Sequence, residues 1–152
     1  MHAALVEARK ALASDEVPIG AIVALEDQIV AAAFNQPISA VDPTAHAEVQ
    51  ALRLAARKVG NYRLTGATLC VTVEPCAMCV GAIVHARIGT LIYGAPEPKT
   101  GAVRSTMKLI DDPSWNHRVT VVSGLMADEC RALLQEFFKG KRKKDKGIGP
   151  GD

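Results

Sequence analysis

Two short motifs constrain the fold of this chain more than any other feature of its sequence: His46-Ala47-Glu48 and Pro75-Cys76-Ala77-Met78-Cys79. Each comes at the expected start of a helix that follows a loop or a strand. The two cysteines are three residues apart, so a helix places their side chains on one face, where both thiols can bind one metal ion. A helix N-terminus also favours the thiolate form, and Pro75 suits the first turn. The second motif therefore predicts part of a metal site at a helix N-terminus.

The first motif can belong to the same site only if the metal lies beyond the helix end. His46 and Glu48 are two residues apart, which is about 200° around an ideal helix. Their side chains can reach one point only where first-turn side chains extend forward from the helix N-terminus. The sequence therefore predicts that two helix N-termini converge, with the metal between them.

The number of ligands indicates a catalytic site. His46, Cys76 and Cys79 supply three ligands, whereas a structural zinc site uses four and leaves no position for water. Zinc lowers the pKa of a bound water towards neutrality. Glu48, which is not needed as a ligand, would take the proton of that water and later hand it to the substrate. We therefore expect Zn2+ as the cofactor and Glu48 as the catalytic residue.

Three other interpretations of these residues compete with the catalytic one. Cys70 or Cys130 could be a fourth ligand and close a structural site, although neither has a partner at ligand spacing and both suit buried apolar positions. The C-x-x-C pair could be a redox pair, which leaves the nearby H-x-E motif unexplained. His46 could be an ordinary capping or surface histidine, which is the default for an isolated residue but not for one in this pattern.

Apolar runs and their breakers predict a chain of mixed α/β class. We expect helices over 3–13, 45–58, 75–86 and 126–139, strands over 19–25, 29–34, 67–73, 91–94 and 119–122, and a short helix near 106–109 in an irregular segment. The first two strands favour an antiparallel hairpin. Because short crossover helices join later strands, some pairing must be parallel, and helices must cover the sheet. The expectation is one mixed five-stranded sheet with helices on both faces.

The length of 152 residues suits a single core, and the charge is concentrated at one end. The net charge of the whole chain is +2, yet six basic and only two acidic residues follow from Lys139 onwards. We predict a domain over 1–139 and a basic, flexible tail over 140–152. Such a tail can attract a polyanion such as nucleic acid, or it can simply be a solvated end.

Several classes of protein are disfavoured. No apolar run is long enough to span a bilayer and no signal-peptide pattern is present, so we expect a cytoplasmic protein. In that compartment the four cysteines favour metal or catalytic use over disulfides. The sequence contains no glycine-rich nucleotide-binding loop and no redox-cofactor motif.

The H-x-E motif followed by P-C-x-x-C is the signature of the zinc nucleobase deaminases of the cytidine deaminase-like superfamily. Beyond this signature, the chain resembles the bacterial tRNA adenosine deaminases over nearly its whole length. The stretches that carry the resemblance are Glu16-Val17-Pro18-Ile19-Gly20-Ala21, Asp42-Pro43-Thr44-Ala45-His46-Ala47-Glu48, Asn61-Tyr62-Arg63-Leu64, Glu74-Pro75-Cys76-Ala77-Met78-Cys79, His85-Ala86-Arg87-Ile88-Gly89, Lys99-Thr100-Gly101-Ala102, Asn116-His117-Arg118-Val119 and Ala127-Asp128-Glu129-Cys130.

This resemblance implies a three-layer α/β/α fold and a homodimer. It also implies hydrolytic conversion of adenosine to inosine at the wobble position of a tRNA anticodon, usually that of arginine tRNA. The target base would be splayed from the anticodon loop into the pocket. Asn35 matches a family position that contacts the flipped nucleotide, and the segment that carries Glu97 and Lys99 would line the anticodon groove.

The chain departs from the family pattern at two places in these regions. Before Lys-Thr-Gly the family commonly has Ala-Arg-Asp or Ala-Asn-Asp, whereas this chain has Ala95-Pro96-Glu97-Pro98. After the asparagine the family often has arginine, whereas this chain has Gln36. Both departures concern RNA contacts and leave the zinc ligands intact.

Two other functions remain open from the sequence. A guanine or cytidine deaminase of the same superfamily would share the zinc signature, although the 61–64 and 116–119 stretches and the basic tail speak against it. A non-catalytic zinc-containing protein that binds RNA belongs to a different class. Such a protein has no use for a carboxylate beside an open zinc position, so Glu48 discriminates between them.

Overall fold

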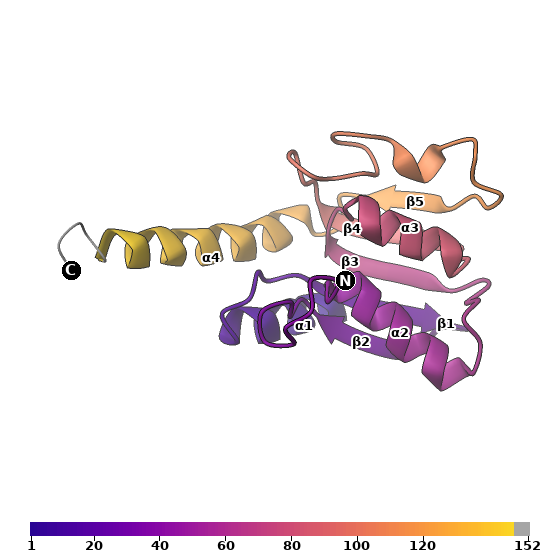
Figure 1. The fold of residues 1–152 in the computed structure, drawn as a ribbon, viewed down its shortest axis with the longest axis horizontal. Helices are drawn as coiled ribbons and strands as arrows, with labels where there is room; N and C mark the ends of the chain where they lie inside the picture. The colour runs from indigo at the N-terminus through magenta and orange to yellow at the C-terminus, as the bar shows by residue number, and fades with distance from the viewer. Residues whose placement is uncertain (148–152) are drawn as a thin grey trace.

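A computed structural model describes residues 1–147 and shows a five-stranded sheet between two layers of helices (Figure 1). The strands are β1 (Gly20–Leu25), β2 (Gln28–Phe34), β3 (Thr68–Val73), β4 (Thr90–Ala95) and β5 (Thr120–Ser123). The helices are α1 (His2–Ala13), α2 (Ala47–Val59), α3 (Ala77–His85) and α4 (Ala127–Gly147), with a 3-10 turn, η1, at Leu109–Asp111. The predicted elements are all present, and their bounds agree closely except at η1 and at the end of α4.

The sheet is mixed because its two halves are connected differently. Its strand order is β2-β1-β3-β4-β5. β1 pairs antiparallel with both β2 and β3, whereas β3, β4 and β5 run parallel. The β1–β2 turn places Glu26 and Asp27 at φ 52° and 62°, the left-handed conformation of a type I′ hairpin turn. The parallel pair β3–β4 needs a crossover, which α3 provides. The predicted mixed five-stranded sheet is confirmed.

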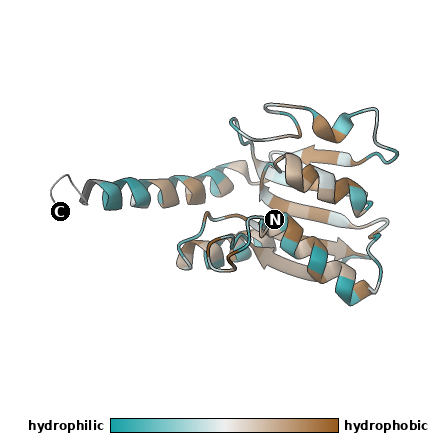
Figure 2. Ribbon diagram, in the orientation of Figure 1, coloured by the Kyte–Doolittle hydropathy of each residue, from teal (hydrophilic) through white to brown (hydrophobic). Residues whose placement is uncertain are grey.

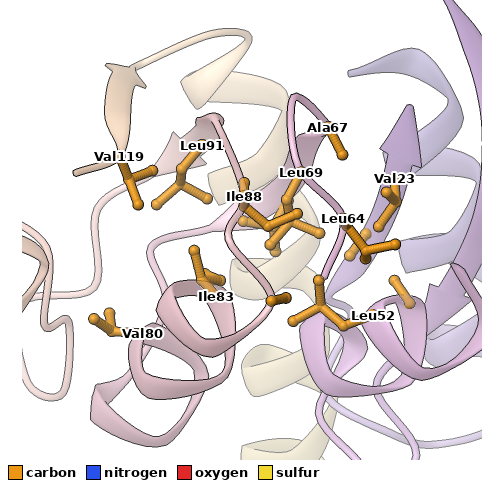
Figure 3. Close-up of a cluster of buried hydrophobic side chains, with 14 of the residues drawn as sticks. Val23, Leu52, Leu64, Ala67, Leu69, Val80, Ile83, Ile88, Leu91 and Val119 are labelled. Atoms are coloured by element: carbon orange, nitrogen blue, oxygen red, sulfur yellow. The ribbon is translucent and has the colours of Figure 1, made fainter. Parts of the chain in front are cut away.

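Each face of the sheet is covered by two helices. α2 and α3 pack against each other on one face, and α1 and α4 do so on the other (Figure 1). The main core lies under α2 and α3. There, Val23, Leu69 and Leu91 of neighbouring strands share a cluster with Leu52 of α2 and Ile83 of α3 (Figure 3). The expected three-layer α/β/α architecture is therefore confirmed.

This core fixes where α2 and α3 begin. Leu69 and Ile83 are fully shielded from water, and burying such a side chain contributes about 1.5–3 kcal/mol. The buried residues of α2 are mostly alanines, which let the helix lie close to the sheet. Gly60, at φ 80°, ends α2 in the left-handed conformation that favours glycine. With both helices held against the sheet and each other, their N-terminal ends are fixed relative to one another.

α4 is longer than the sequence predicts. The sequence places its end at Lys139, but the helix continues through Gly140 to Gly147, so that prediction is wrong. An interior glycine costs a helix only about 1 kcal/mol, and the basic residues that follow Gly140 favour helix. Lys141 also lies 5.5 Å from the centre of the Phe137 ring and 3.1 Å from the Asp15 carboxylate.

The far half of α4 extends beyond the sheet and is hydrophilic (Figures 1 and 2). The first part of the predicted basic tail, 140–147, is thus a helix, and the remainder, 148–152, lies outside the described residues. Neither α4 nor any other helix within residues 1–147 combines the length and the apolar character needed to cross a membrane.

Candidate metal centre

Two helix N-termini meet at the three candidate ligands. His46 immediately precedes α2, and Cys76 immediately precedes α3. Both residues are extended, with φ/ψ of −70°/151° and −78°/175°, so their side chains project beyond the helix ends. Cys79 lies one turn into α3 and faces the same point. The convergence of two helix N-termini is the arrangement that the spacing of the motifs predicts.

The distances between the ligand atoms fit a tetrahedral metal ion. His46 Nδ1 lies 3.6 Å from Cys76 Sγ and 3.5 Å from Cys79 Sγ, and the ligand atoms of all three residues lie within 4.8 Å of one another. Zinc binds sulfur at about 2.3 Å and imidazole nitrogen at about 2.0–2.1 Å, so a tetrahedron separates these two atoms by about 3.6 Å. The three side chains therefore fit three corners of a zinc tetrahedron.

The other two cysteines lie apart from this group. Cys70 and Cys130 are buried on the opposite face of the sheet, where their sulfurs lie 4.0 Å and 3.9 Å from the sulfur of Met1. Within residues 1–147, the group that could hold a metal contains His46, Cys76 and Cys79 alone. The alternative in which Cys70 or Cys130 closes a four-ligand structural site is therefore contradicted.

The charges of the two cysteines differ. Hydrogen bonds from Cys79 and His46 lower the pKa of Cys76 to about 4, against the effect of burial. The hydrogen bond to Cys76 and burial raise the pKa of Cys79. The hydrogen bond to Cys76 also raises the pKa of His46. The protein by itself thus stabilises one thiolate in this group, and a divalent cation is what would stabilise the second.

Glu48 is a buried carboxyl beside the ligands. It lies in the first turn of α2 and is 4% exposed. Burial raises its pKa to about 7, and the nearby charge of Cys76 acts in the same direction. A carboxyl whose pKa is near neutrality can both accept and release a proton at pH 7. This is the property that the predicted proton carrier needs.

Asn35, a predicted substrate contact, lies at the end of β2 and close to the start of α2. The next N–H, that of Gln36, donates to the carbonyl oxygen of Ala45 at 3.0 Å, and Ala45 directly precedes His46. Asn35 is only 6% exposed. This backbone bond therefore holds Asn35 close to the residue that precedes His46.

Glu97 and Lys99, the other predicted substrate contacts, lie in a loop that is attached to the second motif. The Glu97 N–H donates to Glu74 Oε1 at 3.1 Å, and the Lys99 N–H donates to Glu97 Oε1 at 2.9 Å. Glu74 comes two residues before Cys76. The Lys99 side chain is exposed, so the structure fixes its backbone and leaves its ammonium group in solvent.

Two buried acids of this region were given no role by the sequence pattern. Glu16 is 1% exposed and Glu74 is 4% exposed. Both belong to stretches that carry the family resemblance. Their position beside predicted apolar strands could have suggested that both acids are buried. A buried carboxylate must find hydrogen-bond donors, so each would be expected to bind neighbouring backbone or hydroxyl groups.

Comparison with known proteins places this chain among the deaminases. A family model of MafB19-like deaminases matches residues 1–142. A tRNA-specific adenosine deaminase from Haemophilus influenzae is 46% identical over 147 residues, which cover 96% of this chain and 85% of that protein. The tRNA-specific adenosine deaminase from Bacillus subtilis is 42% identical over 146 residues, which cover 96% of this chain and 91% of that protein.

Solved structures agree in fold and differ in sequence identity. One structure, from work on A-to-I editing by tRNA:A34 deaminases at the wobble position, matches with a TM-score of 0.86 and 46% identity, over 88% of this chain and 97% of that chain. A guanine deaminase from Nitrosomonas europaea matches with a TM-score of 0.77 and 26% identity, over 88% of this chain and 80% of that chain. Both proteins share the fold, but the sequence is much closer to the tRNA deaminase.

Proposed function

This chain belongs to the tRNA-specific adenosine deaminases, and from that premise we propose that it hydrolyses adenosine to inosine at the wobble position of arginine tRNA. The observation that carries this proposal is the zinc-like spacing of His46, Cys76 and Cys79 beside the buried Glu48. It occurs in a chain that is 46% identical to a relative named for this activity. Since the substrate is tRNA, we place the enzyme in the cytoplasm.

Zinc is the metal that this ligand set favours. One imidazole nitrogen and two thiolates at tetrahedral spacing suit zinc better than calcium or magnesium, which prefer oxygen ligands. A zinc ion held by three protein ligands lowers the pKa of water at the remaining position to about 7, which supplies a nucleophile at neutral pH. Our assignment of His46, Cys76 and Cys79 as ligands rests on their spacing.

Glu48 would move the protons of the reaction. Hydrolysis adds water to the purine carbon that bears the amino group, and ammonia leaves. Glu48 would take a proton from the attacking water and deliver it to the departing amino group, so the carboxyl ends the cycle in its starting state. Its burial supports this role, because a shielded carboxyl exchanges protons with the substrate rather than with bulk water.

Two loops beside the candidate ligands would hold the RNA. We assign the Asn35 amide to the flipped nucleotide, and Glu97 and Lys99 to the neighbouring nucleotides of the anticodon loop. The first assignment is supported by the backbone bond from the neighbouring Gln36 to Ala45, which holds Asn35 next to the start of α2. The exposed ammonium group of Lys99 supports the second, because a cation in solvent can contact a phosphate.

We also propose that the enzyme is a homodimer. A groove between α2 and α3, with a volume of about 270 Å³, is lined mainly by apolar side chains, including Val49, Ala82 and Tyr62. Met78, at the start of α3, is also exposed. An apolar groove exposed on a monomer marks an interaction site, and a second copy of the chain would cover it.

The basic part of α4 would attract the tRNA. Lys139, Arg142, Lys143 and Lys144 are exposed on the half of the helix that extends beyond the sheet (Figures 1 and 2). A rigid basic helix near the domain can neutralise phosphates outside the anticodon loop and release counterions on binding.

The substrate assignment is tested by offering the zinc-loaded protein several substrates side by side. These are unmodified arginine tRNA, a pool of other unmodified tRNAs, free guanine and cytidine. Sequencing the tRNA should reveal inosine at the wobble position of arginine tRNA. The structural match to a guanine deaminase makes free guanine the informative competitor. Conversion of guanine with no inosine in any tRNA would assign the chain to that activity instead.

A further inference from the structure

Two buried carboxylates outside the metal centre each hold one loop that borders it. The 35–46 loop joins β2 to α2 and carries both Asn35 and His46. The 97–105 loop follows β4 and carries Glu97 and Lys99. Glu16 binds the backbone of the first loop, and Glu74 binds that of the second.

Glu74 gathers an entire loop around one carboxylate. Its Oε2 accepts the N–H groups of Val103 at 3.1 Å, Arg104 at 2.9 Å and Ser105 at 3.0 Å. Its Oε1 accepts the N–H of Glu97 at 3.1 Å and the hydroxyl of Ser105. All five donors belong to the 97–105 loop, and none belongs to the sheet or to a core helix. The bonds therefore define the course of the loop rather than the packing of the core.

The loop and the second motif are joined at one further point. The N–H of Ala102 donates to the carbonyl oxygen of Pro75 at 2.9 Å. Since Pro75 directly precedes Cys76, Glu74 and Pro75 together connect the loop to the start of α3. A shift of this loop would therefore move the predicted RNA contacts relative to the metal ligands.

Glu16 makes the corresponding connection on the other side. Its Oε2 accepts the N–H and the hydroxyl of Ser39, each at 2.8 Å, and its Oε1 accepts the N–H of Ile38 at 3.2 Å. Its own N–H donates to the carbonyl oxygen of Ala11 at the end of α1. The 35–46 loop is thereby attached to α1, an element that packs on the sheet face opposite the metal centre.

We propose that Glu16 and Glu74 are positioning residues that hold the two loops in the conformation that receives the RNA, an inference that rests on the proposed function. Neither carboxylate is free to bind a substrate, because both are buried and occupied by donors from their loops. They act through Asn35 on one side and through Glu97 and Lys99 on the other.

The expected effect follows from preorganisation. When a loop must be ordered before a ligand can bind, the apparent dissociation constant rises by the reciprocal of the competent fraction. If the loop has its RNA-binding conformation in only about one molecule in ten, tRNA binds about tenfold more weakly. The turnover rate of the enzyme saturated with tRNA is unchanged. A loop-holding residue should therefore alter KM much more than kcat.

The test replaces each acid by its amide. Glu74→Gln and Glu16→Gln remove the charge and convert one acceptor oxygen into a donor. Glu26→Gln makes the same change in an exposed hairpin turn and is the matched control. For each zinc-loaded variant, kcat and KM on arginine tRNA, zinc content and hydrogen exchange of the loop amides are measured.

For Glu74→Gln we expect KM to rise about tenfold, with kcat within about twofold of the wild-type value and zinc content unchanged. The amides of Val103, Arg104 and Ser105 should exchange faster, with amides of the core strands unaffected. Glu16→Gln should raise KM in the same way and speed exchange at Ile38 and Ser39. Glu26→Gln should match the wild type in every readout.

Milder variants keep the inference testable if an amide variant does not fold. Ser105→Ala and Ser39→Ala each remove one hydroxyl donor and leave the backbone donors in place, so each should raise KM about threefold with kcat retained. Unchanged KM and unchanged amide exchange in these variants would overturn the inference. A fall in kcat at constant KM, or loss of zinc, would also overturn it. Inactivity of the wild-type enzyme on tRNA would refute the proposed function instead, and the exchange data would still report on the loops.

Discussion

Gly101→Ala adds one methyl group where the 97–105 loop crosses the Glu74 carboxylate. The new Cβ would overlap the Cδ of Glu74 and would lie 2.5 Å from its Oε1 and from the carbonyl oxygen of Glu97. Ordinary carbon contacts are about 3.5–4.0 Å, so these atoms must separate by about 1 Å or more. The carboxylate cannot yield on its own, because the backbone donors of Val103, Arg104 and Ser105 hold it in place.

The expected loss of stability in Gly101→Ala is set by the costs of two possible responses. Overpacking of this kind costs about 1–3 kcal/mol. Displacing the carboxylate from its donors costs more, since each hydrogen bond to a charged group contributes about 1.5–3 kcal/mol. The cheaper response is a local shift of the backbone around Gly101 that leaves the donors of Val103, Arg104 and Ser105 on Glu74. We therefore expect the free energy of unfolding to fall by about 1–3 kcal/mol, which corresponds to a drop in Tm of about 2–12 °C for a chain of this size.

The assay is urea unfolding of the zinc-loaded protein, followed by circular dichroism, together with KM on arginine tRNA. Gly140→Ala is the control, because its Cβ would meet nothing within 4 Å and its helical position favours alanine. The Gly101 variant should lose stability and show a raised KM, whereas the Gly140 variant should be as stable as the wild type or more so. A Gly101→Ala variant with wild-type stability and wild-type KM would refute the packing of this loop on Glu74.

Three further predictions concern the metal, the acid response and α4. Cys79→Ser should reduce bound zinc from about one ion per chain to nearly none and abolish deamination, as measured by atomic absorption and inosine formation; retention of the ion would exclude Cys79 as a ligand. Hydrogen bonds from Ser39 and Ile38 outweigh burial and hold the pKa of Glu16 below its usual 4.5, so its stabilisation is complete above that pH and is lost as the pH falls through the lowered pKa. The free energy of unfolding should therefore decline less steeply below pH 4.5 in Glu16→Gln than in the wild type, and parallel pH profiles would contradict this. Removal of residues 140–152 should weaken tRNA binding and reduce its salt dependence, by about 0.7–0.9 in log–log slope for each phosphate that this segment neutralises, with kcat at saturating tRNA retained; an unchanged salt dependence would exclude a role for the segment.

The convergence of His46, Cys76 and Cys79 could be predicted from the sequence because the two motifs carry metal-ligand residue types at ligand spacing. If these residues are to share one metal ion, the chain has to bring the starts of two helices together, which is the arrangement found. The apolar runs around these motifs indicate the helices and strands, since period and breakers are local properties. The crossover between β3 and β4 then follows from the need to cover a parallel pair.

The parts that escaped prediction depend on interactions between distant residues. Glu74 meets donors that lie 23–31 positions away, and Glu16 meets donors 22 and 23 positions away, so no local pattern reveals them. The predicted end of α4 is wrong because a single glycine interrupts a helix less than its usual place at helix ends suggests. The hydrogen bond of Lys141 to Asp15, 126 positions away, supports the longer helix and has no local signal in the sequence.

The role of Glu48 as the proton carrier of a zinc-dependent tRNA deamination has one most direct test. It measures inosine at the wobble position of arginine tRNA for the wild type and for Glu48→Ala, after both proteins have been shown to bind zinc. We predict equal zinc content, similar tRNA binding, and no detectable inosine with the variant. Inosine formation by zinc-loaded Glu48→Ala at the wild-type rate would contradict this role.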